Sequence, residues 1–232
     1  MNKILYISIL ITAAFFILSC DDMNDLHEGY LAEGEIIYAA QVDSVSIHTG
    51  YYRAELELLI NSQRIEKVRI FWNDYADSSD ISIGSQTGVF FHLLDDMDER
   101  DYIFHCVSLD KYDNPSLPFE LTGTVYGENY KTQLSNRRVS LAVTAVDSVE
   151  NVLSLTWTTL SSLDQGVTME YFNADSTWVQ LDVPADEQVT YIESWFPETT
   201  FRYSTLYKPT EDAIDVFEAD YTEGTFPEMA SE

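Results

Sequence analysis

The sequence VDSV at Val42–Val45 occurs a second time at Val146–Val149, 104 residues further along the chain. Two other pairs of stretches match at an offset of 99 residues, namely Leu56–Leu58 (LEL) with Leu155–Trp157 (LTW), and Asp101–Phe104 (DYIF) with Thr200–Tyr203 (TFRY). A period of about 100 residues is the size of one seven-stranded sandwich domain. We therefore expect two copies of one domain, because the alternative, a single large sandwich, would not repeat internally at this period.

Short runs rich in Val, Ile, Tyr, Phe and Thr recur roughly every 8 to 15 residues around these repeats, separated by Asp, Asn, Gly and Pro. This pattern predicts an all-β fold of two tandem immunoglobulin-like or fibronectin type III-like β-sandwiches, with little helix. The strands predicted for the first copy are Ile36–Ile47, Arg53–Ile60, Lys67–Asn73, Val89–Leu94, Tyr102–Leu109 and Phe119–Tyr126. Those predicted for the second copy are Val139–Val146, Val152–Thr158, Val167–Phe172, Trp178–Val183, Val189–Ser194, Phe201–Tyr207 and Ile214–Ala219.

The start of the chain has the pattern of a secretory signal. A positive charge lies within Met1–Lys3, and Ile4–Leu18 is uncharged and short for a membrane span. This run ends in ILSC at Ile17–Cys20, which resembles a bacterial lipobox, whose cysteine thiol receives diacylglycerol before cleavage frees its amine for acylation. We expect residues 1–19 to be a signal peptide and Cys20 to anchor the protein to membrane lipid, since two or three acyl chains bind stably. The alternative is an ordinary signal peptide with a chance cysteine.

The remaining chain is divided by composition. We expect a lipidated acidic tether at 20–33, a first sandwich at 34–126, a linker at 127–138, a second sandwich at 139–224 and a frayed tail at 225–232. The acidic stretch Asp21–Asp25 resembles the surface-export signal of Bacteroidetes lipoproteins, and a solvated tether is the alternative. The linker holds three of the twelve basic residues, so we expect it to dock on acidic domain surfaces.

Charge and cysteine content exclude several classes of protein. Forty acidic and twelve basic side chains give a net charge of −28, which excludes nucleic acid as a default partner because phosphate would be repelled. Two cysteines do not make a disulfide framework. With Cys20 acylated, Cys106 has no intramolecular partner, and its apolar neighbours predict a small buried side chain.

Particular aromatic residues match positions in fibronectin-type sandwiches. Met97 lies five residues before Tyr102, an arrangement that resembles a tyrosine corner, in which the phenol hydrogen-bonds to backbone in the loop that joins the two sheets. Trp72 and Trp157 lie on central predicted strands, where we expect core packing rather than a ligand surface.

Further stretches are similar to those of two-repeat Bacteroidetes lipoproteins of unknown function: Val42–Val45, Ile70–Asn73, Asp110–Ser116, Tyr126–Tyr130, Val183–Glu187 and Phe201–Tyr207. The similarity covers most of the chain from Cys20 to Tyr221. Leu58 departs from it, because a tryptophan is expected there, as at Trp157. The resemblance implies fibronectin-type repeats and a cell-envelope location, often beside outer-membrane glycan-import systems, and it transfers no catalytic residue.

The sequence contains no strong catalytic, metal or cofactor motif. The four histidines have no spacing suited to a metal, and HExxH and CxxC motifs are absent. The acidic clusters Asp95–Asp101 and Asp110–Asn114 lack the glycine and distal glutamate of an EF-hand, so we expect solvated turns. Asp-Ser-Val at Asp43 and Asp147, and Asp-Ser-Thr at Asp175, match a short O-glycosylation pattern that also arises by chance.

One strand carries a candidate binding surface. On Trp178–Val183, alternation places Trp178, Gln180 and Asp182 on one side and the aliphatic residues on the core side. A tryptophan beside an amide and a carboxylate suits a sugar ring, because the aromatic face packs on C–H bonds and polar neighbours select hydroxyls. Trp195, in the loop after the next strand, is the second candidate. The alternative is that both tryptophans cover a sandwich end or the interdomain seam.

These observations favour a non-enzymatic, lipid-anchored binding or accessory protein of the cell envelope, in the outer membrane and exposed at the surface. Its expected partners are membrane lipid through Cys20 and a glycan captured beside an import system, or an envelope protein. A structural protein–protein interaction module without a small ligand is the alternative. A hydrolase with two carboxylates is a third, more distant reading, because forty acidic residues make chance pairs unavoidable.

Overall fold

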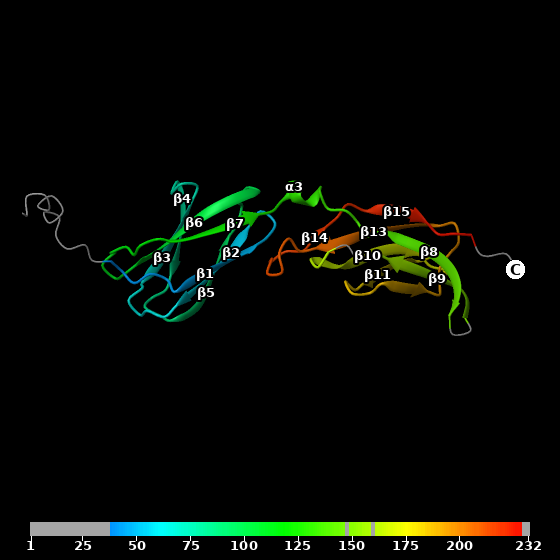
Figure 1. Ribbon diagram of the computed structural model, residues 1–232, viewed down its shortest axis with the longest axis horizontal. Helices are drawn as coiled ribbons and strands as arrows, with labels where there is room; N and C mark the ends of the chain where they lie inside the picture. The colour runs from blue at the N-terminus through cyan, green and yellow to red at the C-terminus, as the bar shows by residue number, and fades with distance from the viewer. Residues whose placement is uncertain (1–37, 147–148, 159–160, 229–232) are drawn as a thin grey trace, which may run out of the picture. The chain divides into compact units, whose positions relative to one another are not determined.

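The computed structural model describes residues 38–146, 149–158 and 161–228, and the fold lies within the unit Ala39–Glu232 (Figure 1). The predicted signal peptide, the lipidation site Cys20 and the acidic tether lie outside the described residues. Among the residues that are described, no helix is long and apolar enough to cross a membrane.

The first sandwich consists of two antiparallel sheets. One has the order β1-β2-β5 and the other β4-β3-β6-β7. The strands are β1 (Ser44–Thr49), β2 (Ala54–Ile60), β3 (Lys67–Trp72), β4 (Asp77–Ser82), β5 (Gly88–Leu94), β6 (Arg100–Leu109) and β7 (Phe119–Val125).

Alternation along the strands forms the first core. Along β2, Ala54, Leu56, Leu58 and Ile60 are fully buried, and the intervening residues are half-buried. Fully burying one leucine or isoleucine side chain stabilises a fold by about 1.5–3 kcal/mol, so this one row supplies a large share of the driving force. Leu58 thus fills the core position where a tryptophan was expected.

Two sequence predictions about the first core are confirmed. Tyr102 is buried, and its hydroxyl donates to the backbone oxygen of Asp98 at 3.1 Å, while Met97 is buried beside the corner. This is the predicted tyrosine corner. Cys106 on β6 is fully buried in the same core. Trp72 is only half-buried but packs against it.

The second sandwich repeats this plan with a different last strand. Its sheets have the orders β8-β9-β12 and β11-β10-β13, and both β14 and β15 pair with β13. The strands are β8 (Val139–Val146), β9 (Val149–Trp157), β10 (Asp164–Phe172), β11 (Trp178–Val183), β12 (Val189–Ile192), β13 (Thr200–Tyr207), β14 (Phe217–Glu218) and β15 (Thr222–Thr225). The predicted all-β fold with two tandem sandwiches is confirmed.

A buried ion pair lies inside the second sandwich. Arg137 Nε donates to Asp164 Oδ2 at 2.5 Å, and neither side chain is exposed beyond 1%. Its remaining donors reach backbone oxygens of Pro184, Ala185 and Glu187. Such a pair is tolerated only because the charges and donors are satisfied together. The linker, expected to dock on an acidic surface, thus contributes a residue to the interior.

Several strands differ from the sequence predictions. The strand predicted at Ile36–Ile47 begins only at Ser44, the strand predicted at Val189–Ser194 ends at Ile192, and β15 was not predicted. Strand β4 (sequence DSSDIS) was not predicted, because it is a polar edge strand without an apolar alternation. The tail predicted at 225–232 is wrong at its start, since Thr225 ends β15 and Phe226 is buried in the second core. The predicted strand Ile214–Ala219 shortens to β14.

The two sandwiches share a seam of aromatic rings and ion pairs within the unit Ala39–Glu232, and His48 lies 3.4 Å from Asp212 there. The ring of Phe217 lies 5.9 Å from Tyr51, 6.1 Å from Tyr126 and 5.0 Å from Tyr130. Tyr130 belongs to the short linker helix α3 (Glu128–Lys131). Arg53 donates to both carboxylate oxygens of Asp215, at 2.9 and 2.5 Å.

Candidate functional site

The candidate site lies on the outer face of the sheet β11-β10-β13. Trp178, Gln180 and Asp182 point outward from β11, and Trp178 is 56% exposed. Val179 and Leu181 pack against the second core, and Val183 is buried. The orientation predicted from alternation is therefore present, and it leaves an exposed indole on a folded sheet.

The Trp178 indole is supported by a second aromatic ring. Phe172 on β10 pairs with Trp178 in the strand register, and the ring centroids lie 4.2 Å apart at an interplanar angle of 46°. Packing against Phe172 restricts the indole, so the exposed aromatic surface has a defined orientation.

Polar groups continue from the indole across the face. In register, Glu170 on β10 lies between Gln180 on β11 and Arg202 on β13. Arg202 Nε donates to Glu170 Oε2 at 2.7 Å. Gln180 Nε2 donates to Asp182 Oδ1 at 3.1 Å. The row thus alternates amide, carboxylate and guanidinium, which are groups that pair with hydroxyls.

The charge of Arg202 is fixed by its neighbours. The hydrogen bond to Glu170 raises the pKa of the guanidinium, and the carboxylate charge acts in the same direction. Arg202 also lies over the ring of Tyr221, at 4.7 Å from its centroid. Tyr221 therefore adds a third aromatic ring near the site, after Trp178 and Phe172.

A shallow depression of about 260 Å³ marks the site, lined by Glu170, Trp178, Val179 and Gln180. We call this surface the Trp178 face and define it by Thr168, Glu170, Phe172, Trp178, Gln180, Asp182, Arg202 and Tyr221. Thr168 Oγ1 lies on it, 3.3 Å from Asp182 Oδ1. An aromatic surface beside hydrogen-bonding side chains can hold a flat, hydroxyl-rich ligand.

Trp195 does not belong to the Trp178 face. Its side chain is 6% exposed, its Nε1 donates to the backbone oxygen of Asn151 at 2.8 Å, and its ring packs edge-on against Phe226. The prediction of Trp195 as a glycan contact is therefore wrong, because the ring is part of the core of the second sandwich. Trp157 is likewise buried, with Nε1 donating to Thr190 Oγ1 at 2.9 Å.

Sequence reasoning missed Glu170, Phe172, Arg202 and Tyr221. Alternation alone places Arg202 outward on β13, opposite the buried Phe201 and Tyr203. What alternation does not supply is the neighbour order β11-β10-β13, which brings these residues beside Gln180.

The acidic clusters considered for calcium hold loops in place. Glu99 accepts from the backbone nitrogens of Asn129 and Tyr130 at 2.7 and 2.6 Å. The side-chain hydrogen bond from Asn114 lowers the pKa of Asp110, and backbone nitrogens act in the same direction. In the part of the chain that the structure describes, no group of three or more His, Cys, Asp or Glu side chains is placed to hold a metal ion.

Fold and strand order define the class of protein: an all-β protein of two tandem sandwiches, each made of two antiparallel sheets. The chain belongs to the DUF4998 family, a domain of unknown function, whose model matches residues 20–217. No match is found among curated proteins.

Among solved structures, two chicken proteins are similar in fold. The FN1–FN3 domains of chicken CNTN1 match with 11% identity and a TM-score of 0.38. The match covers 82% of this chain and 65% of the CNTN1 chain. The two-domain fibronectin type III segment of chicken tenascin matches with 13% identity and a TM-score of 0.32, over 82% of this chain and 100% of that one.

Proposed function

We propose that the protein is a non-catalytic, lipid-anchored binding protein of the bacterial cell envelope, and that its Trp178 face contacts a neutral glycan. The observation that carries the proposal is the exposed indole of Trp178 beside Gln180, Glu170 and Arg202. The ring supplies apolar contact for one face of a sugar. The neighbouring polar groups supply donors and acceptors for its hydroxyls.

A binding role suits this face better than catalysis. Glu170 is paired with Arg202, and Asp182 accepts from Gln180 and lies within 3.3 Å of Thr168. Carboxylates engaged in this way are oriented by their partners, which suits hydroxyl recognition. The acid of a glycosidase lies instead in an apolar setting.

The test compares two exposed aromatic residues on different sheets of the second sandwich. Neutral oligosaccharides found on a glycan array are titrated by calorimetry against the mature chain and its Trp178→Ala variant. Losing a stacked ring at a binding hot spot costs about 2 kcal/mol or more, which is about thirtyfold in affinity.

Tyr191→Ala is the matched control, because Tyr191 is 54% exposed but lies on β12. Its affinity should equal that of the unmodified chain. Unchanged affinity in Trp178→Ala would remove Trp178 from the site. An array without any bound glycan would overturn the glycan proposal.

Membrane anchoring is tested separately. Cys20→Ala should move the protein from the membrane fraction to the soluble fraction, because no acyl chain can be added without the thiol. Persistent membrane association of this variant would contradict the anchoring proposal.

A protein-interaction module is the second candidate, and one observation favours it. On the edge strand β5, Val89, Phe91 and Leu93 are exposed in a row, and Val89 and Phe91 have exposed counterparts at Val189 and Tyr191 on β12. Exposed apolar rows on edge strands favour pairing with another chain. Capture of an envelope protein that is lost with Phe91→Asp and kept with Trp178→Ala would select this function.

A further inference from the structure

A cavity in the first sandwich gathers two basic side chains that have no acidic partner. Of the basic residues that the structure describes, Arg53, Lys67, Arg69, Arg137 and Arg202 are paired with carboxylates. Within the described ranges, neither Arg64 nor Lys111 has a carboxylate oxygen within 4.0 Å of its cationic nitrogens. In a chain of net charge −28, these two side chains bring two positive charges to one cavity.

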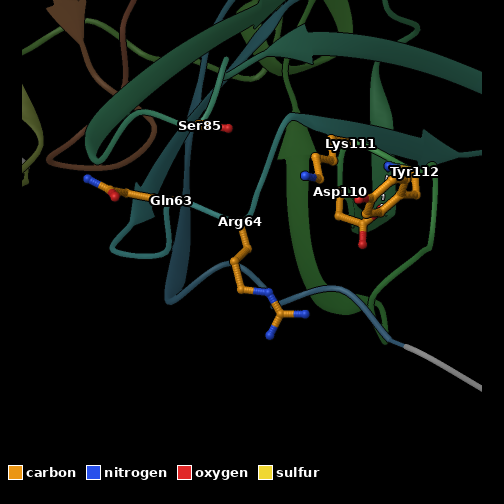
Figure 2. A pocket seen from close by; sticks show the side chains of 6 residues that line it. All are labelled: Gln63, Arg64, Ser85, Asp110, Lys111 and Tyr112. Carbon is orange, nitrogen blue, oxygen red and sulfur yellow. Dashed lines mark hydrogen bonds between the residues drawn. The ribbon is translucent and has the colours of Figure 1, made fainter.

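The cavity is formed by three loops at one end of the first sandwich. These loops follow β2, β4 and β6, and they enclose about 320 Å³. The lining residues are Gln63, Arg64, Ser85, Asp110, Lys111 and Tyr112. Figure 2 shows Arg64 on one side of the cavity, and Asp110, Lys111 and Tyr112 on the other. A volume of this size is at the lower end of the range for small-molecule sites, about 300–1,000 Å³.

Hydrogen bonds hold these loops in place. Asp110 Oδ1 accepts from the backbone nitrogens of Tyr112 and Asn114 at 2.8 and 3.0 Å, and Oδ2 accepts from the Asn114 amide at 2.9 Å. Ser85 donates to Glu66 at 3.1 Å through its hydroxyl. Asp110 is nearly buried and engaged in these bonds, so it anchors the loop, and the charge of Arg64 acts on it as a smaller effect that also lowers the pKa of its carboxyl.

An exposed aromatic ring completes the cavity. Tyr112 is 73% exposed, and Lys111 Nζ lies 4.7 Å from its ring centroid. Most of the ring surface lies in water and is open to a ligand. It offers an apolar contact beside the two cations.

We propose that this cavity binds a uronic acid residue of an acidic glycan. The carboxylate pairs with the Arg64 guanidinium and the Lys111 ammonium, and the sugar ring packs on Tyr112. Gln63 and Ser85 provide polar groups for the hydroxyls. Guanidinium–carboxylate pairs are the strong, oriented contacts of such sites.

A sugar is favoured over an acidic peptide by the lining itself. The six side chains end in amide, guanidinium, hydroxyl, carboxylate, ammonium and phenol groups, and none is aliphatic. Peptide recognition uses a sheet edge or apolar pockets for side chains, and neither is part of this cavity. The hydroxyl groups and the single carboxylate of a uronic acid residue match these polar lining groups.

The test uses a short oligogalacturonate and its methyl ester, titrated by calorimetry against the full mature chain. The ester keeps the sugar rings and removes the charge, so it should bind at least tenfold more weakly. Arg64→Ala should weaken oligogalacturonate binding at least tenfold. Lys131→Ala is the matched control, since Lys131 lies on α3, outside the cavity, and removes the same charge without effect.

Other outcomes overturn the proposal. Absence of oligogalacturonate binding does so, and so does equal binding of the ester or of Arg64→Ala. Equally tight, Arg64-dependent binding of oligoglutamate would assign the cavity to acidic peptides instead. Trp178→Ala should leave oligogalacturonate affinity unchanged, so failure at this cavity and failure at the Trp178 face are distinguished.

Discussion

The two sandwiches share one plan but are closed by different contacts. In the first, the phenol of Tyr102 donates to the backbone oxygen of Asp98 and the core is apolar. In the second, the matching position is Phe201, which has no hydroxyl, and Tyr203 donates instead to the backbone oxygen of Arg137 at 2.9 Å. Arg137 itself forms the buried pair with Asp164. The two copies thus share their strand positions. In the second copy, the hydrogen bond from Tyr203 to the linker residue Arg137 takes the place of the tyrosine corner.

Gly166 allows the backbone of the second sandwich to accommodate the Arg137–Asp164 pair. The register of β10 against β13 shifts between Asp164 and Gly166, and Gly166 has φ +121°. A Cβ atom there would lie 2.4 Å from the backbone oxygen of Val183. Only glycine permits this bulge, which aligns Asp164 with Arg137.

Removal of the buried Arg137–Asp164 pair should lower the free energy of unfolding more than any other change considered. Arg137→Ala leaves Asp164 charged and unpaired inside the second sandwich, which costs about 3–5 kcal/mol. Three of the four tryptophans, Trp157, Trp178 and Trp195, lie in this sandwich, so fluorescence during urea unfolding reports on it. Arg69→Ala, which removes an exposed pair with Asp80, should cost about 1 kcal/mol or less. Equal effects of both variants would contradict a special role for Arg137.

Substitutions at the tyrosine corner should change the free energy of unfolding by a smaller amount, and they test whether the two sandwiches differ at this position. Tyr102→Phe removes one hydrogen bond and should lower the free energy of unfolding by about 0.5–1.5 kcal/mol. Phe201→Tyr makes the reciprocal change in the second copy, where a new hydroxyl in the buried core needs a partner. A gain in stability from Phe201→Tyr, measured by urea unfolding, would show that a corner can form there too.

The seam should give the smallest effect, and it depends on pH. The hydrogen bond from Arg53 lowers the pKa of Asp215 below its ordinary value of 3.8, and the backbone nitrogen of Tyr51 acts in the same direction. A lowered folded-state pKa means that the stabilisation is present above pH 3.8 and is lost as pH falls through the lowered value. Asp215→Asn should therefore cost about 0.2–1 kcal/mol at pH 7.

This cost should shrink as the pH falls below 3.8, because the unmodified carboxyl then also becomes neutral. Urea unfolding of both chains at pH 7 and at pH 3 measures the difference. A cost that is the same at both values would mean that the ion pair contributes nothing. Asp80→Asn provides the control, because the Arg69–Asp80 pair lies within the first sandwich.

The sequence predicted what depends on local alternation and missed what depends on long-range pairing. The outward positions of Trp178, Gln180 and Asp182 followed from β11 alone. Trp195 lies in a loop without alternation, so its burial against Phe226 could not be predicted. β4 is polar apart from Ile81, so its sequence shows no apolar alternation, and its pairing with β3 makes it a strand.

The cavity on the first sandwich is also assembled by topology. Arg64 and Lys111 are 47 positions apart in the sequence, and only the packing of the loops after β2 and β6 brings them to one cavity. A run of basic residues would have been visible in the sequence, whereas two isolated cations among forty acids were not.

The burial of Cys106 has a practical consequence for chemical labelling. Burial raises the pKa of its thiol to about 12, so almost no thiolate exists at neutral pH. A maleimide or an oxidant needs an accessible thiolate, and in the folded protein it finds none at this position. A cysteine introduced at Tyr112 or Tyr191, which are exposed, would therefore carry a fluorophore alone once Cys20 is acylated. Cys106 therefore need not be replaced before such a label is introduced.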